Sequence, residues 1–103
     1  MTFNKILKEL RQGRVVRRKA YSSDLVIFMQ IPAYIECENT WNMKSLPTDM
    51  KVLLKQLNSD ISYQDQFIMY DLYNKSATYM VFDGLDINAT DWEVIDPFNY
   101  KYE

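Results

Sequence analysis

Hydrophobic residues recur along the chain at two spacings, and the helical spacing comes first. The apolar positions at i, i+3, i+4 and i+7 are Phe3, Ile6, Leu7 and Leu10. Thr2 is a suitable N-cap before them, and Gly13 supplies the left-handed residue that often ends a helix. The basic residues of this segment fall on the other face and toward its C-terminal end, where the helix dipole favours them. The pattern predicts an amphipathic helix between Thr2 and Gly13.

Short β-branched and apolar runs predict strands farther along the chain. The runs are 15–18, 25–31, 34–37, 61–69 with a bend at 64–66, 77–82 and 92–95. The run at 25–31 reads as a strand buried on both faces, and Pro32 interrupts it. Asn74 and Lys75 lie between two runs and predict a hairpin.

A second helix is predicted after Pro47, with Thr48 as its cap and an apolar stripe formed by Val52, Leu53 and Leu57. Polar residues 39–45 predict a loop, and residues 85–90 predict one short helical turn. The fold class is therefore α+β: an antiparallel sheet of about five strands with two helices, in a single small domain spanning residues 1–103.

Composition restricts the chemistry. The 103 residues include no histidine, two glycines and one cysteine, Cys37. This excludes zinc sites built on Cys and His, Cys–His and Ser–His nucleophilic pairs, an intrachain disulfide and a glycine-rich phosphate loop. A magnesium site made of carboxylates stays open, but enzyme functions are poorly supported and no cofactor is expected.

Charge is distributed unevenly. The net charge is −2, yet the first twenty residues carry seven cations and one acid. This asymmetry suits an anion-binding edge, although the two halves can equally neutralise one another within or between subunits. A pI near 5.1 disfavours long nucleic acid and leaves a small phosphorylated ligand as the better match. The chain has no apolar run of membrane-spanning length and no signal-peptide core at its start, so we expect a cytoplasmic protein without a membrane partner.

Two groups of residues are candidates for binding. Arg17 and Arg18 lie on opposite faces of a strand, where an arginine fork can hold a phosphate and the nearby Tyr21 can stack on a base. A charged edge strand that discourages aggregation is the alternative interpretation. The second group is Asp86, Asn88, Thr90 and Asp91. Its asparagine and threonine can read ribose hydroxyls or base edges, but residues of these types are also common in caps and turns.

These same segments resemble the Thoeris anti-defence two family of small phage proteins. The opening matches in the helix 2–10, Gly13, the sequence Val-Arg-Arg at 16–18 and the aromatic Tyr21. The closing segment 86–94 is similar to the family's aspartate and alanine before an Asp-Trp-Glu-Val strand. Ser45-Leu46-Pro47 and the helix after it resemble the family's middle. The resemblance covers about residues 1–95.

The resemblance implies a homo-oligomer, typically a tetramer, with ligand pockets at protomer interfaces. Members bind glycocyclic ADP-ribose signals without cleaving them, which starves a bacterial defence effector, and some also hold cyclic oligonucleotides. By motif match, Tyr21 replaces the family's usual tryptophan as the residue that stacks on adenine. Arg17 or Arg18 would face the pyrophosphate, and Asn88 and Thr90 would add polar contacts.

Two departures from the family pattern bear on the ligand. Tyrosine offers a smaller stacking surface than tryptophan, and Tyr63-Gln64-Asp65 stands where the family often has Tyr-x-Pro. The resemblance makes a nucleotide-signal sponge in the cytoplasm of an infected bacterium the leading hypothesis. A protein–protein interaction module that inhibits a host protein is the second hypothesis, and a metal-dependent phosphodiesterase is the third.

Overall fold

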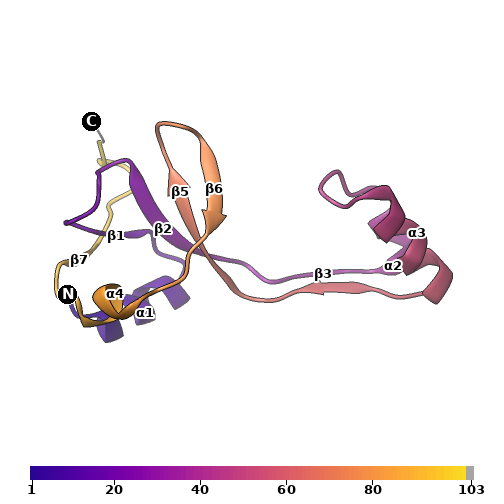
Figure 1. Cartoon of the computed structure of the whole chain (residues 1–103), viewed down its shortest axis with the longest axis horizontal. Coiled ribbons are helices and arrows are strands. Elements are labelled where there is room, and N and C mark those ends of the chain that lie inside the picture. Colours follow the sequence, from indigo (N-terminus) through magenta and orange to yellow (C-terminus); the bar gives the residue numbers. More distant parts are fainter. Residues whose placement is uncertain (102–103) are drawn as a thin grey trace. The chain divides into compact units, whose positions relative to one another are not determined.

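The computed structural model describes residues 1–101, which divide into two compact units (Figure 1). The first, the sheet unit, comprises residues 1–30 together with the described residues from Gln66 onward. The second, the ribbon unit, comprises Ile31–Asp65.

The sheet unit is built on a five-stranded antiparallel sheet with the strand order β6-β5-β2-β1-β7. Its strands are β1 (Val16–Arg18), β2 (Leu25–Gln30), β5 (Gln66–Asp71), β6 (Ser76–Tyr79) and β7 (Trp92–Val94). Its helices are α1 (Phe3–Arg11) and α4 (Gly84–Asn88). The register places Val16 opposite both Ile27 and Val94, so the first and last strands of this unit are neighbours.

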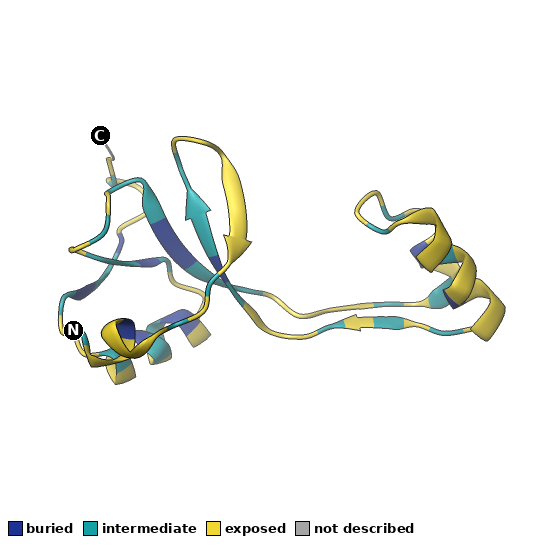
Figure 2. Cartoon of the chain, viewed as in Figure 1, coloured by how far each residue is buried: buried dark blue, intermediate teal, exposed yellow. Residues whose placement is uncertain are grey.

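One face of the sheet, the inner face, carries the main core beneath α1. Ile6 and Leu10 are fully buried there against Val16, Ile27 and Trp92 (Figure 2). Burying side chains of this size contributes roughly 1.5–3 kcal/mol each. The core thus joins α1 to strands from both ends of the chain.

The other face of the sheet, the outer face, is also apolar. Side chains alternate along a strand, so Val26 and Ile68 point away from α1, and both are buried. The segment after β7 contributes to this face through Tyr100, whose hydroxyl donates a hydrogen bond to the carbonyl of Ser23. A shallow apolar hollow remains beside it.

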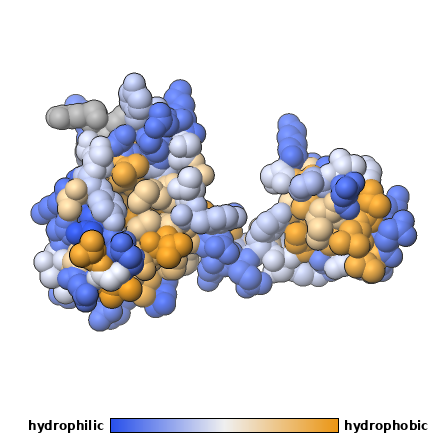
Figure 3. Space-filling model, in the orientation of Figure 1, coloured by the Kyte–Doolittle hydropathy of each residue, from blue (hydrophilic) through white to orange (hydrophobic). Residues whose placement is uncertain are grey.

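The ribbon unit pairs β3 (Ala33–Ile35) with β4 (Ile61–Tyr63) and carries two helices, α2 (Cys37–Thr40) and α3 (Thr48–Leu57). The carboxylate of Asp60 ties them together, because it accepts hydrogen bonds from the Tyr34 hydroxyl and, at 2.7 Å, from the Cys37 amide. Apolar side chains gather on the surface of its helical end in Figure 3. The exposed ones include Trp41, Met50, Val52, Leu53 and Leu57.

The α+β class and the five-stranded antiparallel sheet are confirmed, with a two-stranded sheet and two short helices added. So are the Thr2 cap of α1, the left-handed Gly13 with φ of 85°, and the hairpin at Lys75. Among the described residues, no helix combines the length and apolarity needed to cross a bilayer.

Three local predictions are wrong in the ribbon unit, and in the sheet unit the strand predicted at 77–82 ends at Tyr79. Thr48 is the first residue of α3 rather than its cap, since Pro47 occupies the N-cap position. Leu54, and not the predicted stripe, is the buried residue of α3. Residues 37–40 form α2 where strand and loop were expected, and because α2 packs on α3, it determines which face of α3 is covered.

Candidate functional site

Strand β1 presents its two arginines to opposite faces of the sheet, as alternation predicts. Arg17 lies opposite Glu93 in the register and Arg18 lies opposite Trp92. Trp92 belongs to the inner core, so Arg18 is on the inner side and Arg17 on the outer side. The two guanidinium groups therefore have different partners.

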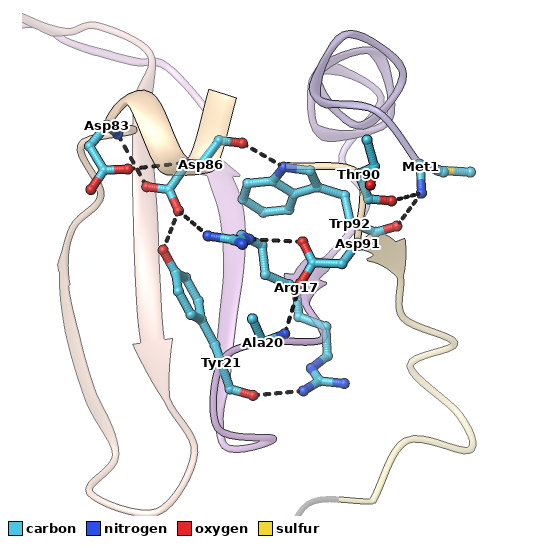
Figure 4. Close-up of polar contacts among 10 residues, drawn as sticks. Met1, Arg17, Ala20, Tyr21, Asp83, Asp86, Thr90, Asp91 and Trp92 are labelled. Carbon is cyan, nitrogen blue, oxygen red and sulfur yellow. Dashed lines mark hydrogen bonds and ion pairs between the residues drawn. The ribbon is translucent and has the colours of Figure 1, made fainter. Parts of the chain in front are cut away.

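Arg18 forms a cluster with Tyr21, Asp86 and Asp91, here called the ion-pair cluster. Figure 4 labels these three partners. The Nε of Arg18 donates to Asp91 Oδ1 at 2.9 Å, and an Nη donates to Asp86 Oδ1 at 3.1 Å. The Tyr21 hydroxyl donates to the same Asp86 oxygen. The Arg18 guanidinium also lies 5.0 Å from the centroid of the Tyr21 ring and 6.0 Å from that of Trp92, within cation–π range.

Asp86 is the most constrained member of the cluster, with an exposed fraction of 2%. It forms a capping box at the start of α4, where its amide donates to Asp83 Oδ1 at 2.9 Å and its Oδ2 accepts from the Asp83 amide at 3.1 Å. Its carbonyl accepts the Trp92 indole N–H at 2.9 Å. Asp86 thereby connects α4, the core tryptophan and Arg18.

The cluster shifts the acidities of its members. Burial works to raise the pKa of Asp86, but hydrogen bonds from Tyr21, from the Asp83 amide and from Arg18 outweigh it and hold that pKa below its usual value. The hydrogen bond from Arg18 likewise lowers the pKa of Asp91. Burial, followed by the hydrogen bond to Asp86, raises the pKa of the Tyr21 phenol. At neutral pH the cluster holds one cation, two carboxylates and a neutral phenol.

Arg17 has a different environment on the outer side. One Nη donates to Glu93 Oε1 at 2.8 Å, and the other donates to the Tyr21 carbonyl at 3.0 Å. Its Nε is buried and has no hydrogen-bond partner among the described residues. A buried N–H without a partner is costly, so this Nε is an unsatisfied donor within the sheet unit.

The hollow on the outer face lies on the same side of the sheet as Arg17. It has a volume of about 370 Å³, at the small end of the range for ligand sites. Its walls are mostly apolar and are formed by Val15, Val26, Phe28, Tyr70, Leu72, Ile95, Pro97 and Tyr100. Val15 and Arg17 are two residues apart in the chain, which places them on one face.

Of the second predicted group, Asp86 and Asp91 belong to the ion-pair cluster, whereas Asn88 and Thr90 lie beside it. Asn88 ends α4 and Thr90 follows it, and both are exposed. The Thr90 carbonyl accepts a hydrogen bond from the Met1 nitrogen at 3.0 Å. The structure thus brings the side chains of Arg18 and Tyr21 together on the inner side, leaves Arg17 on the outer side, and places Asn88 and Thr90 at the periphery.

Sequence reasoning did not assign the carboxylate partners of the arginines. Asp86, Asp91 and Glu93 lie 68 to 76 positions from the arginines that they bind. The only signal for this pairing was the basic opening and acidic remainder of the chain, for which mutual neutralisation was one of the two explanations. That explanation holds for these three contacts.

The chain matches no protein-family model and no curated protein. The inner side offers an aromatic ring beside a guanidinium, and the outer side offers a shallow apolar hollow. Such groups suit the binding of a planar, phosphorylated molecule.

Proposed function

We propose that this protein binds a cyclic ADP-ribose-type signalling nucleotide without cleaving it and thereby suppresses bacterial anti-phage defence. A sponge of this kind needs complementarity and slow release rather than catalytic groups. The proposal includes assembly into a homo-oligomer, with pockets completed by neighbouring protomers.

One observation carries the proposal: side chains from the two segments that resemble the family contact one another in the ion-pair cluster. Arg18 and Tyr21 come from the opening segment, and Asp86 and Asp91 come from the closing segment. A resemblance limited to helix and strand patterning would not require these side chains to contact one another. Their contact supports a shared arrangement of residues around the ligand.

The contacts also distinguish the two arginines. Two carboxylates already bind Arg18, which suits it to hold the Tyr21 ring in place. Arg17 has a single carboxylate partner, Glu93, and we assign to it the contact with the pyrophosphate. Tyr21 stacks on adenine, a contact worth roughly 1–3 kcal/mol.

The test is recovery of the ligand from the protein. Purified protein is mixed with glycocyclic ADP-ribose, free ligand is removed by filtration, and the protein is denatured by heat before the released molecules are analysed. Intact ligand in stoichiometric amount supports the proposal. Cleaved ligand would make the protein an enzyme, and a failure to deplete the ligand would reject binding of this class.

Variants of Tyr21 separate stacking from structural effects. Tyr21→Ala is expected to abolish retention, whereas Tyr21→Phe keeps the ring and is expected to retain the ligand despite losing the hydrogen bond to Asp86. Tyr21→Trp restores the larger surface and should bind at least as tightly. If Tyr21→Phe and Tyr21→Ala lose retention equally while remaining folded by circular dichroism, the ring does not stack on the ligand.

A second candidate function is inhibition of a host protein through the ribbon unit. The supporting observation is the apolar surface of its helical end, where Leu57 is 66% exposed and Trp41 51% exposed. Exposed clusters of this kind mark interaction sites. Leu57→Glu should relieve defence suppression in infected cells if this function holds, and it should leave suppression unchanged if the protein acts by retaining a nucleotide.

A further inference from the structure

Strand β6 is an outer edge of the five-stranded sheet, and nothing on it discourages pairing. Its sequence, Ser-Ala-Thr-Tyr at 76–79, contains no charge and no proline. All four residues are exposed, as Figure 2 shows, and Tyr79 is 72% exposed. Edge strands in monomeric proteins are usually protected by charged residues, prolines or bulges, so an uncharged edge is open to another strand.

The opposite edge of the same sheet, strand β7, is less open to pairing. Strand β7 carries the charged Glu93, and the Trp92 carbonyl accepts a hydrogen bond from the Met1 nitrogen at 2.7 Å. That contact occupies an acceptor on β7, while β6 has strand β5 as its one partner among the described residues. The two edges therefore differ in their capacity to recruit a strand.

One hydrogen bond determines which groups of β6 point outward. The Met80 amide donates to the Phe67 carbonyl at 2.8 Å, toward β5. Because the backbone groups of alternate residues point to the same side of an antiparallel strand, Thr78 also bonds toward β5. The amides and carbonyls of Ala77 and Tyr79 consequently point away from the sheet.

We propose that β6 pairs antiparallel with β6 of a second copy of this chain, with Thr78 on the two-fold axis. In this register Ala77 of one copy and Tyr79 of the other exchange both backbone hydrogen bonds, and the reciprocal pair does the same. A register centred on Ala77 would need Lys75 in the strand, but Lys75 has a left-handed φ of 56°. A register centred on Tyr79 would extend past the end of β6.

The side chains fit this register. The small Ala77 lies opposite the large Tyr79 of the second copy, and no like charges face one another across the axis. A second outer-face hollow of about 440 Å³ borders Ala77 and is lined by Phe28, Gln30, Ile68, Ala77, Thr78 and Tyr79. The tyrosine of the second copy lies over Ala77, at the mouth of this hollow. The proposed pairing thus involves both the backbone edge of β6 and the apolar outer face of the sheet.

This pairing deepens the proposed function, because it names the surface through which two copies assemble, and it rests on that function for the expectation of a homo-oligomer. A segment of another protein added to the same edge is the competing occupant. Cross-linking and the mass of the purified protein distinguish the two.

The experiment places a cysteine on the axis. In a Cys37→Ser background, the cysteine of Thr78→Cys should form a disulfide with the same cysteine of the second copy under mild oxidation. The reason is that a non-hydrogen-bonded pair places the two Cα atoms about 4.5 Å apart. The matched control, Ser76→Cys, lies opposite Met80 of the second copy, so its two cysteines are about 14 Å apart and should not react. Non-reducing electrophoresis should show a band of twice the chain mass for Thr78→Cys alone.

Equal cross-linking of both variants, or of neither, would overturn the pairing. Light scattering gives an independent measurement with the native cysteine in place. Thr78→Lys, which sets two ammonium groups on the axis, should lower the mass of the assembly by a factor of two, and an unchanged mass would also overturn the proposal. Ligand retention is measured on the same samples. Retention without cross-linking would refute the pairing alone, and cross-linking without retention would refute the proposed function alone.

Discussion

The substitution Asp86→Asn tests whether the ion-pair cluster stabilises the sheet unit. Asp86 Oδ1 accepts from Arg18 and Tyr21, and its Oδ2 accepts from the Asp83 amide. An asparagine has a single acceptor oxygen, so its NH₂ group must face one of these donors in a buried position. A buried donor without an acceptor costs about 1–3 kcal/mol, and breaking a fully buried ion pair costs about 3–5 kcal/mol.

We expect a loss of about 3 kcal/mol in the free energy of unfolding, at the lower end for a broken pair because Arg18 keeps its 2.9 Å contact with Asp91. For a domain of this size each kcal/mol corresponds to roughly 4–8 °C, so the melting temperature should fall by more than about 10 °C. Thermal unfolding followed by circular dichroism measures this change. The control Asp65→Asn makes the same change in net charge at an exposed position and should leave the melting temperature unchanged.

The stability difference between the wild type and Asp86→Asn should also depend on pH. The pKa of Asp86 is lowered in the folded protein, so its contribution is present above the unfolded-state pKa of about 3.9 and is lost as the pH falls through the folded-state value. The gap between the wild type and Asp86→Asn should therefore be full at pH 7 and should shrink below about pH 4. Equal melting of Asp86→Asn and Asp65→Asn at pH 7, or a gap that persists undiminished in acid, would refute the reasoning.

Three further predictions follow from single residues. Gly13 has a φ of 85°, so Gly13→Ala should cost about 1 kcal/mol in urea unfolding, and an unchanged midpoint would mean that the turn accepts a side chain. Tyr21→Phe should cost about 1 kcal/mol through loss of its hydrogen bond to Asp86, and the double variant with Asp86→Asn should lose less than the sum of the two effects. Trp41 is 51% exposed and Trp92 is 1% exposed, so Trp41→Phe should remove the iodide-quenchable part of the fluorescence; strong quenching of the remaining tryptophan would contradict its burial.

The elements that sequence reasoning placed correctly are those in which local pattern and tertiary burial agree. The spacing of Ile6 and Leu10 gave the apolar face of α1, and both side chains are fully buried against the sheet. Alternation likewise separated Arg17 from Arg18, and the register with β7 sends them to different partners. In both cases neighbours in the chain determine the geometry.

The ribbon unit shows where local pattern fails. Leucine occupies both position 53 and position 54, and periodicity cannot decide which of them faces a partner whose existence is not foreseen. Helix α2 is four residues long and polar in sequence, so it carries no hydrophobic signal, yet its packing buries Leu54 and leaves Leu53 48% exposed. The carboxylates that bind the β1 arginines are also set by a partner that local pattern does not reveal, here one far away in the sequence. Charge asymmetry predicts that the two halves neutralise one another, but it does not predict which residues pair.

The charges at the site limit how an anionic ligand can be held there. Arg17 and Arg18 supply two positive charges, and Asp86, Asp91 and Glu93 supply three negative ones, so these five residues carry a net charge of −1. Their summed field does not attract a pyrophosphate, so under the proposed function the binding energy has to come from stacking and from hydrogen bonds donated by Arg17. Lys5, Lys8 and Arg11 on the exposed side of α1 form no ion pair among the described residues. These three cations belong to the helix that covers the inner face, whereas Arg17 lies on the outer side. Under the proposed function, the cations that attract a ligand over long range and the arginine that contacts it therefore lie on different surfaces of one chain. Assembly of copies offers a way to bring such surfaces together, and this is the physical reason to expect that a complete site needs more than one chain.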